Sequence, residues 1–167
     1  MTAYPHQPTR HGLRNFLVRE TYVMGAVTGI LCVFFAWLFF SGQADVPVWG
    51  GEGIMMDQVP GTILPVLAIC LITPAAIRVR RRKGEIPDLN WEDVTGIVRL
   101  VPRNLLVRTV VLCAVWFIVF VGGSYLALWA GGWISVPFHA LLGVKAAYGV
   151  LLGASLCPFV LLPSIGR

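Results

Sequence analysis

Lys145 is the residue whose type and position suggest chemistry most directly, because it is the only charged side chain in the stretch 109–166. An unpaired ammonium at the centre of a bilayer costs at least about 2.5–3.5 kcal/mol, so it needs a partner or a water-filled cavity. Tyr148 and His139 are polar neighbours that could share a site with it. Asp57 is the candidate counter-charge, and an anionic ligand is the alternative partner.

Two positions are open for Lys145 relative to the membrane. If its helix begins at Val136, Lys145 lies about 13 Å along the axis at 1.5 Å per residue, close to mid-membrane. However, the segment from Ala146 to Pro163 is nearly long enough to span the membrane alone. In that arrangement Lys145 marks the outer boundary and extends to the headgroups, while 133–144 lies along the surface.

Catalytic chemistry is scarce elsewhere in the chain. It contains no Ser/His/Asp constellation, no HExxH motif and no glycine-rich phosphate loop. The cysteines fall one in each apolar run, without CxxC spacing or a nearby histidine, so we expect buried thiols that pack as small hydrophobes. They are Cys32, Cys70, Cys113 and Cys157. We therefore expect no catalytic residue, no metal site and no cofactor. We expect Glu20, next to Arg19, to be a surface partner rather than a buried proton carrier, because buried acids are rare in membrane spans.

The composition indicates an integral membrane protein. Of the 167 residues, 57% are hydrophobic and only 13% are charged, and the mean hydropathy is +0.77. A soluble domain of this size carries about a quarter charged residues. The charges also lie in blocks between long uncharged runs, so the net charge of +5 reflects membrane topology rather than nucleic-acid binding.

The apolar runs predict an all-α membrane protein with four transmembrane helices, near 16–40, 60–78, 105–130 and 137–163. The first run could also be a signal peptide, but its nineteen uncharged residues exceed the roughly 7–15 of a signal sequence, which favours an uncleaved span. Small-residue faces for close helix packing are offered by Gly25-x-x-x-Gly29 and Gly149-x-x-x-Gly153. The acidic segment 41–62 is expected to be a loop that folds onto the membrane surface or caps the helix ends.

Charge asymmetry predicts the orientation. All basic residues except Lys145 fall on one side of the predicted spans, which the positive-inside rule makes cytoplasmic, with both termini inside. The expected location is the cell inner membrane. A basic cluster at the end of the second span is expected to bind anionic lipid headgroups; it consists of Arg78, Arg80, Arg81, Arg82 and Lys83.

A short cytoplasmic helix is predicted over 91–101. Asn90 is a suitable N-cap, and Val94, Ile97, Val98 and Val101 recur at helical spacing on one face. This helix could lie in the membrane interface or pack on the cytoplasmic helix ends.

A repeated hexapeptide predicts an internal duplication. The segment 103–108, Arg-Asn-Leu-Leu-Val-Arg, matches 14–19, Arg-Asn-Phe-Leu-Val-Arg, at five of six positions. We therefore expect two hairpins in one domain, about 14–78 and about 103–167, joined by a linker over about 79–102. Because each copy has two spans, the copies would share one orientation and form a parallel repeat.

Several short motifs resemble a group of small bacterial four-span inner-membrane proteins that carry a permease-like label and no assigned activity. They are Trp49-Gly50 in the acidic loop, Thr73-Pro74 before the basic cluster, Leu100-x-Pro102-Arg103 before the third span, and Phe138 seven residues before Lys145. The chain has Cys157-Pro158 where the pattern would have Thr-Pro, so the correspondence of the two halves is loose there. The resemblance implies a compartment more than an activity.

Two functions follow as hypotheses. The first is a small permease-like or ligand-binding membrane protein with a polar site between the hairpins, around Lys145, Tyr148 and His139. The second is a non-catalytic accessory or assembly subunit that binds anionic lipid or a larger membrane complex, as a homo-oligomer or with other subunits.

Overall fold

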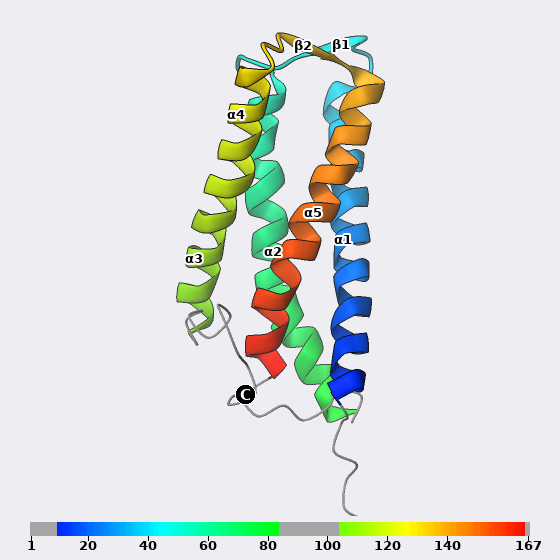
Figure 1. The fold of residues 1–167 in the computed structure, drawn as a ribbon, viewed down its shortest axis with the longest axis vertical. Coiled ribbons are helices and arrows are strands. Elements are labelled where there is room, and N and C mark those ends of the chain that lie inside the picture. The colour runs from blue at the N-terminus through cyan, green and yellow to red at the C-terminus, as the bar shows by residue number, and fades with distance from the viewer. Residues whose placement is uncertain (1–9, 84–103, 166–167) are drawn as a thin grey trace, which may run out of the picture.

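The computed structural model describes residues 10–83 and 104–165, with side chains from residue 15 onward. In that part of the chain, long helices form a bundle that is capped at one end by a two-stranded sheet (Figure 1). The elements are α1 (Arg10–Phe40), β1 (Asp45–Pro47), α2 (Ile54–Arg82), α3 (Leu105–Trp116), the π-helical turn η3 (Phe117–Gly122), α4 (Gly123–Ala130), β2 (Ser135–Pro137) and α5 (Phe138–Ile165). We call the end with the sheet the strand end, and the end where α1 begins and α5 stops the terminal end.

Within residues 10–83 and 104–165, four helical segments are long and apolar enough to cross a membrane, as predicted. They are Asn15–Phe40, Ile54–Arg82, Leu105–Ala130 and Phe138–Ile165. Large apolar side chains such as Ile30, Ile118 and Leu126 are more than 60% exposed on the outside of the bundle. This surface suits hydrocarbon rather than water, and the fold fits a multi-pass membrane protein.

Glycines allow α1 and α5 to pack closely along their length (Figure 1). A Cβ added to Gly149 would lie 2.7 Å from the Cα of Gly29, and one added to Gly153 would lie 2.6 Å from the carbonyl oxygen of Met24. The two Gly-x-x-x-Gly faces therefore meet at one interface. Helix α2 packs on α3 and α5 instead, and it contacts α1 little.

The strands tie the two helical hairpins together at the strand end. β1 and β2 pair antiparallel, with Val46 opposite Val136. Each strand follows a turn that contains a glycine four residues before the paired valine. These glycines are Gly42 (φ 103°) and Gly132 (φ 64°), and their positive φ angles lie in a backbone region that favours glycine. Sequence reasoning did not predict this sheet.

The segment between α1 and α2 caps the helix ends, which was one of its two predicted roles. Val48 is fully buried, together with Val46, in an apolar cluster at this end of the bundle. Trp49 donates from Nε1 to the carbonyl oxygen of Trp133 over 3.0 Å, and its ring packs edge-on against Tyr125.

Two of the predicted helices were too short. α1 begins at Arg10 rather than near 16, and α2 runs from Ile54 to Arg82 rather than from 60 to 78. The earlier start of α2 follows from Gly53, whose extended backbone (φ −84°, ψ 164°) ends the loop before the first helical turn. Asp57 then lies in the first turn, where the helix dipole favours an acidic side chain.

Other predicted boundaries have mixed outcomes. α5 begins at Phe138, so 133–144 does not lie along the surface as one expectation for Lys145 required. The predicted helix 91–101 and most of the linker 79–102 lie outside the described residues.

Candidate functional site

Lys145 lies inside the bundle and is paired there. It is 3% exposed and sits about 10 Å along α5 from Phe138. Its Nζ donates to Oδ2 of Asp57 and to Oε1 of Gln58, each over 2.5 Å. The Lys145 side chain is therefore buried and paired within the bundle, and its depth in the membrane stays a prediction.

The acceptors for Lys145 come from the first turns of α2. Gln58 and Thr62 are one turn apart on the buried face of this helix, and Asp57 precedes Gln58. Gln58 also donates from Nε2 to the hydroxyl of Ser124 over 3.1 Å. The Ser124 hydroxyl in turn donates to the carbonyl oxygen of Phe120 over 2.7 Å, so the amide of Gln58 is fixed from both ends.

Tyr148 completes the group from the next turn of α5. Its hydroxyl is hydrogen-bonded to that of Thr62. The single Thr62 proton is used on the carbonyl oxygen of Gln58 over 2.7 Å, so Tyr148 is the donor. Its ring centroid lies 5.9 Å from Lys145 Nζ, within the range of a cation–π interaction. We call the following residues the polar cluster: Asp57, Gln58, Thr62, Ser124, Lys145 and Tyr148.

The π-helical turn η3 helps to place this cluster. Phe120 lies in η3 and packs edge-on against Tyr148 with a centroid distance of 5.3 Å and an interplanar angle of 90°. Ser124 follows two residues after the turn ends. Single π-helical turns within α-helices occur frequently at functional sites.

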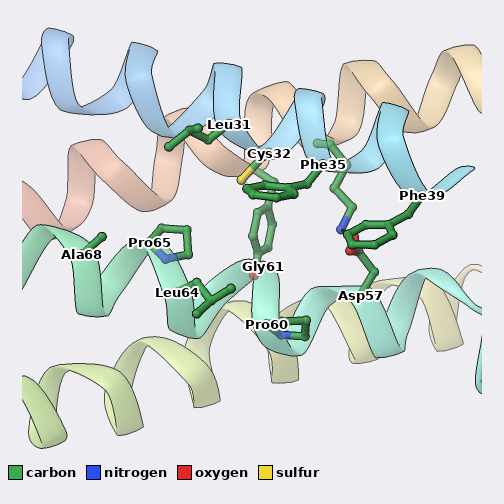
Figure 2. A pocket seen from close by; sticks show the side chains of 12 residues that line it. Leu31, Cys32, Phe35, Phe39, Asp57, Pro60, Gly61, Leu64, Pro65 and Ala68 are labelled. Atoms are coloured by element: carbon green, nitrogen blue, oxygen red, sulfur yellow. Dashed lines mark hydrogen bonds and ion pairs between the residues drawn. The ribbon is translucent and has the colours of Figure 1, made fainter. Parts of the chain in front are cut away.

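A cavity of about 380 Å³ borders the polar cluster between α1, α2 and α5 (Figure 2). Its volume lies within the range of small-molecule sites. Apolar residues form most of the wall, and Asp57 and Lys145 are its charged members. The lining residues are Leu31, Cys32, Phe35, Phe39, Asp57, Pro60, Gly61, Leu64, Pro65, Ala68, Lys145 and Tyr148.

A second pocket, of about 520 Å³, lies at the strand end. It shares Phe39, Asp57 and Pro60 with the cavity, so the two spaces meet at Asp57. Its other polar side chains are those of Gln43 and Glu52. The ion pair therefore stands between an apolar cavity and a polar pocket.

The structure does not bring His139 into this site. The side chain of His139 is exposed, and its ring lies 5.8 Å from that of Phe138. His139 therefore belongs to the surface of the strand end, unlike Lys145, Tyr148 and Asp57.

The basic cluster at the end of α2 divides into two groups. Arg78, Arg82 and Lys83 are exposed. Arg80 instead donates from Nη1 to Oε1 of Glu20 over 2.6 Å, and Arg81 donates to the carbonyl oxygen of Ile165. Two of the five predicted headgroup ligands thus also make contacts within the bundle.

Two charged residues near the terminal end are more buried than expected. Glu20 is 7% exposed and pairs with Arg80 across the bundle, so its expected role as a surface partner is wrong. Arg108 is 1% exposed, with Nη2 3.5 Å from the hydroxyl of Ser164, although it is one of the basic residues that were expected on the cytoplasmic side of the spans.

Sequence reasoning missed Gln58, Thr62 and Ser124. The four-residue spacing of Gln58 and Thr62 would have indicated a shared polar face next to Asp57, had the start of α2 been placed at 54. No pattern in the sequence marks Ser124, because its position depends on the packing of α3 and η3 against α2.

The polar cluster can bind a ligand through charge and hydrogen bonds. Over residues 10–83 and 104–165, no group of three His, Cys, Asp or Glu side chains could hold a metal ion. No protein-family model, curated protein or solved structure matches this chain. The resemblance to permease-like proteins therefore stays a prediction.

Proposed function

We propose that this chain is a small, permease-like ligand-binding protein of the inner membrane, which holds its ligand in the cavity beside the polar cluster. The observation that carries the proposal is the Lys145–Asp57 ion pair, buried within the spans and bordering that cavity. Ionisable residues within membrane spans are rare, and they usually face a cavity or a pathway for a ligand or an ion.

A gain in protein stability does not by itself explain why a buried ion pair is present. Removing two charges from water costs about as much as their attraction returns, and well-packed apolar residues often stabilise a core equally well. An ion pair whose only role was to hold α2 to α5 would also need no cavity beside it. A ligand that contacts Asp57 or Lys145 gives both features a function.

We further propose that the two hairpins, α1–α2 and α3–α5, are copies of one unit and that the site lies between them. In support, each strand contains Val-Pro and follows a glycine with positive φ. The stretch from the start of the repeated hexapeptide to the end of the following helical segment is 14–40 in the first copy and 103–130 in the second, which is one residue longer. The π-helical turn η3 lies in this stretch and accommodates one more residue than an α-helical turn.

The proposed orientation has the strand end outside the cell and the terminal end in the cytoplasm. Asp45, Glu52 and Asp57 lie toward the strand end, where the connecting segments contain no Lys or Arg. Arg78, Arg82 and Lys83 lie at the opposite end, as the positive-inside rule requires of a cytoplasmic surface.

An accessory or assembly subunit is the second candidate. The exposure of Arg78, Arg82 and Lys83 favours it, because these residues could bind anionic headgroups or an acidic partner. A subunit of this kind would depend on its surface and would tolerate filling of the internal cavity.

Retention of a bound molecule tests the proposed function. A Cβ at Gly61 would meet no atom within 4 Å, so Gly61→Leu fills the cavity without a backbone clash. Gly143→Leu is the matched control, because Gly143 also has open space, is exposed on α5 and does not line the cavity.

We expect mass spectrometry of full-length protein, purified in mild detergent, to detect a small molecule retained by the wild type and by Gly143→Leu. The Gly61→Leu variant should lose it while remaining monodisperse. Equal retention by all three proteins, or retention by none, would contradict the proposal.

A further inference from the structure

Building on the proposed function, we infer that the ligand is a single-chain amphiphile with a cationic amine head. Its chain lies in the cavity between α1 and α2, and its amine lies at the strand end beside Asp57 and Glu52. The ligand enters from the membrane through the side of the bundle.

The cavity opens sideways because α1 and α2 barely touch each other. Leu31, Phe35 and Phe39 recur every four residues and form one stripe on α1 (Figure 2). These three side chains are between 42% and 62% exposed, and Leu64 on the opposite wall is 58% exposed. Both walls are thus in contact with the surroundings of the bundle, which in a membrane are lipid chains.

The length of the cavity fits one leaflet of the bilayer. Along α2 it runs from Asp57 to Ala68, about 16 Å at 1.5 Å per residue. This is about half of the roughly 30 Å hydrocarbon thickness of a bilayer. A chain held there would therefore lie parallel to the lipid chains of the leaflet at the strand end.

The charged groups of the cavity are concentrated at that same end. Asp57 and Lys145 meet near Phe39, whereas Leu31, Pro65 and Ala68 line the deeper part (Figure 2). An amphiphile with one polar end matches this distribution, and a uniformly polar solute does not.

The sign of the head group's charge follows from the charged side chains at this end of the cavity. The Lys145 ammonium is bound by Asp57 and Gln58, so its charge is balanced. Glu52 then gives the strand-end pocket a net negative charge.

The amides at the start of α2 offer few free donors to an anionic head group. Of its first four amides, that of Met55 donates to the carbonyl oxygen of Val48, and those of Met56 and Asp57 donate to that of Gly53. An anionic head group would therefore meet the Glu52 carboxylate and few available donors, whereas an amine complements Glu52.

Two amphiphiles with the same chain test the inference. Full-length protein, stripped of lipid in detergent, is titrated with tetradecylamine or tetradecanoate, and binding is measured by native mass spectrometry. We expect the amine to bind at least about tenfold more tightly.

Gly61→Leu should abolish binding and Gly143→Leu should leave it unchanged. Because Glu52 is exposed, Glu52→Gln should reduce the preference for the amine without affecting folding.

Equal or tighter binding of tetradecanoate would overturn the amine assignment, and its loss in Gly61→Leu would still support a ligand in the cavity. If neither amphiphile binds and the molecule retained on purification has no apolar chain, the inference fails and the proposed function stands. If no molecule of any kind is retained or bound, both fail.

Discussion

Lys145 and Asp57 depend on each other because each neutralises the other in a largely buried site. Lys145 is almost fully buried, and the side chain of Asp57 is 14% exposed. Gln58 supplies a second acceptor for the ammonium, so three side chains share one charged hydrogen-bond network. Removing one charge should therefore be more harmful than removing both.

A double-mutant cycle measures this dependence. Lys145→Met leaves the Asp57 carboxylate without its cation, and the loss of one partner of a buried pair costs about 3–5 kcal/mol. We expect Asp57→Asn to be similarly harmful and the double variant to recover much of the loss. The measurement is the free energy of unfolding in detergent, and additive effects of the two single changes would show that the pair is not coupled.

At the residue scale, the sequence indicated the pair but not its surroundings. The single charge in a long apolar stretch singled out Lys145, and Asp57 was the acid placed to reach it. The choice between a buried and a surface lysine depended on where α5 begins, which β2 and the turn at Gly132 determine through tertiary pairing. Residues such as Ser124 enter the site through helix packing and leave no local signal.

At the scale of elements, the interface between α1 and α5 depends on small residues. A Cβ at Gly149 would lie 2.7 Å from both the Cα of Gly29 and the carbonyl oxygen of Thr28. These are backbone atoms, so a larger residue must push the helices apart.

Gly149→Leu should therefore destabilise the bundle by at least about 1–3 kcal/mol, the usual effect of overpacking. Gly143→Leu, the same change where space is open, should have little effect. Thermal unfolding and the yield of monodisperse protein distinguish the two variants. Equal stability would mean that α1 and α5 do not pack as closely as the structure has them.

The terminal end of α2 allows a second prediction for an element. Arg78, Arg82 and Lys83 are exposed, whereas Arg80 and Arg81 also contact the bundle. Each basic residue near an anionic surface contributes about 1 kcal/mol, so replacing the three exposed residues with Gln should weaken binding to anionic vesicles about 100-fold at low salt. Replacing Arg80 and Arg81 should weaken it less and lower stability more. Unchanged vesicle binding by the triple variant would leave the cluster with a role in orientation only.

The existence of the helices could be predicted from the sequence, and their details could not. Runs of uncharged residues are long enough to reveal four spans. However, the six residues before Pro60 were assigned to a loop because the segment 41–62 contains three acids, no bases and several Gly and Pro residues. The three-residue strands are too short for a periodic signal, and the π-helical turn η3 has no distinguishing composition.

At the scale of the whole molecule, the distribution of charged residues predicts how the protein is oriented in the membrane. Asp45 at the strand end and Lys83 at the terminal end are both exposed. In a background without native cysteines, a cysteine at position 45 should react with an impermeant thiol reagent added to intact cells. One at position 83 should react only after the membrane is permeabilised. The reverse pattern would show that the protein is inserted the other way round.

A ligand in the cavity beside the polar cluster is the central claim, and Cys32 provides the most direct test. Its thiol lines the cavity (Figure 2), whereas Cys113 lies on α3 outside it and serves as an internal control. The measurement is the rate at which a small membrane-permeant maleimide modifies each thiol in purified protein, before and after the bound molecule is stripped. We predict that stripping accelerates modification of Cys32 several-fold and that adding the extracted molecule back restores protection, while Cys113 does not change. A Cys32 rate that is the same in both states, or that changes only in parallel with Cys113, would contradict the claim.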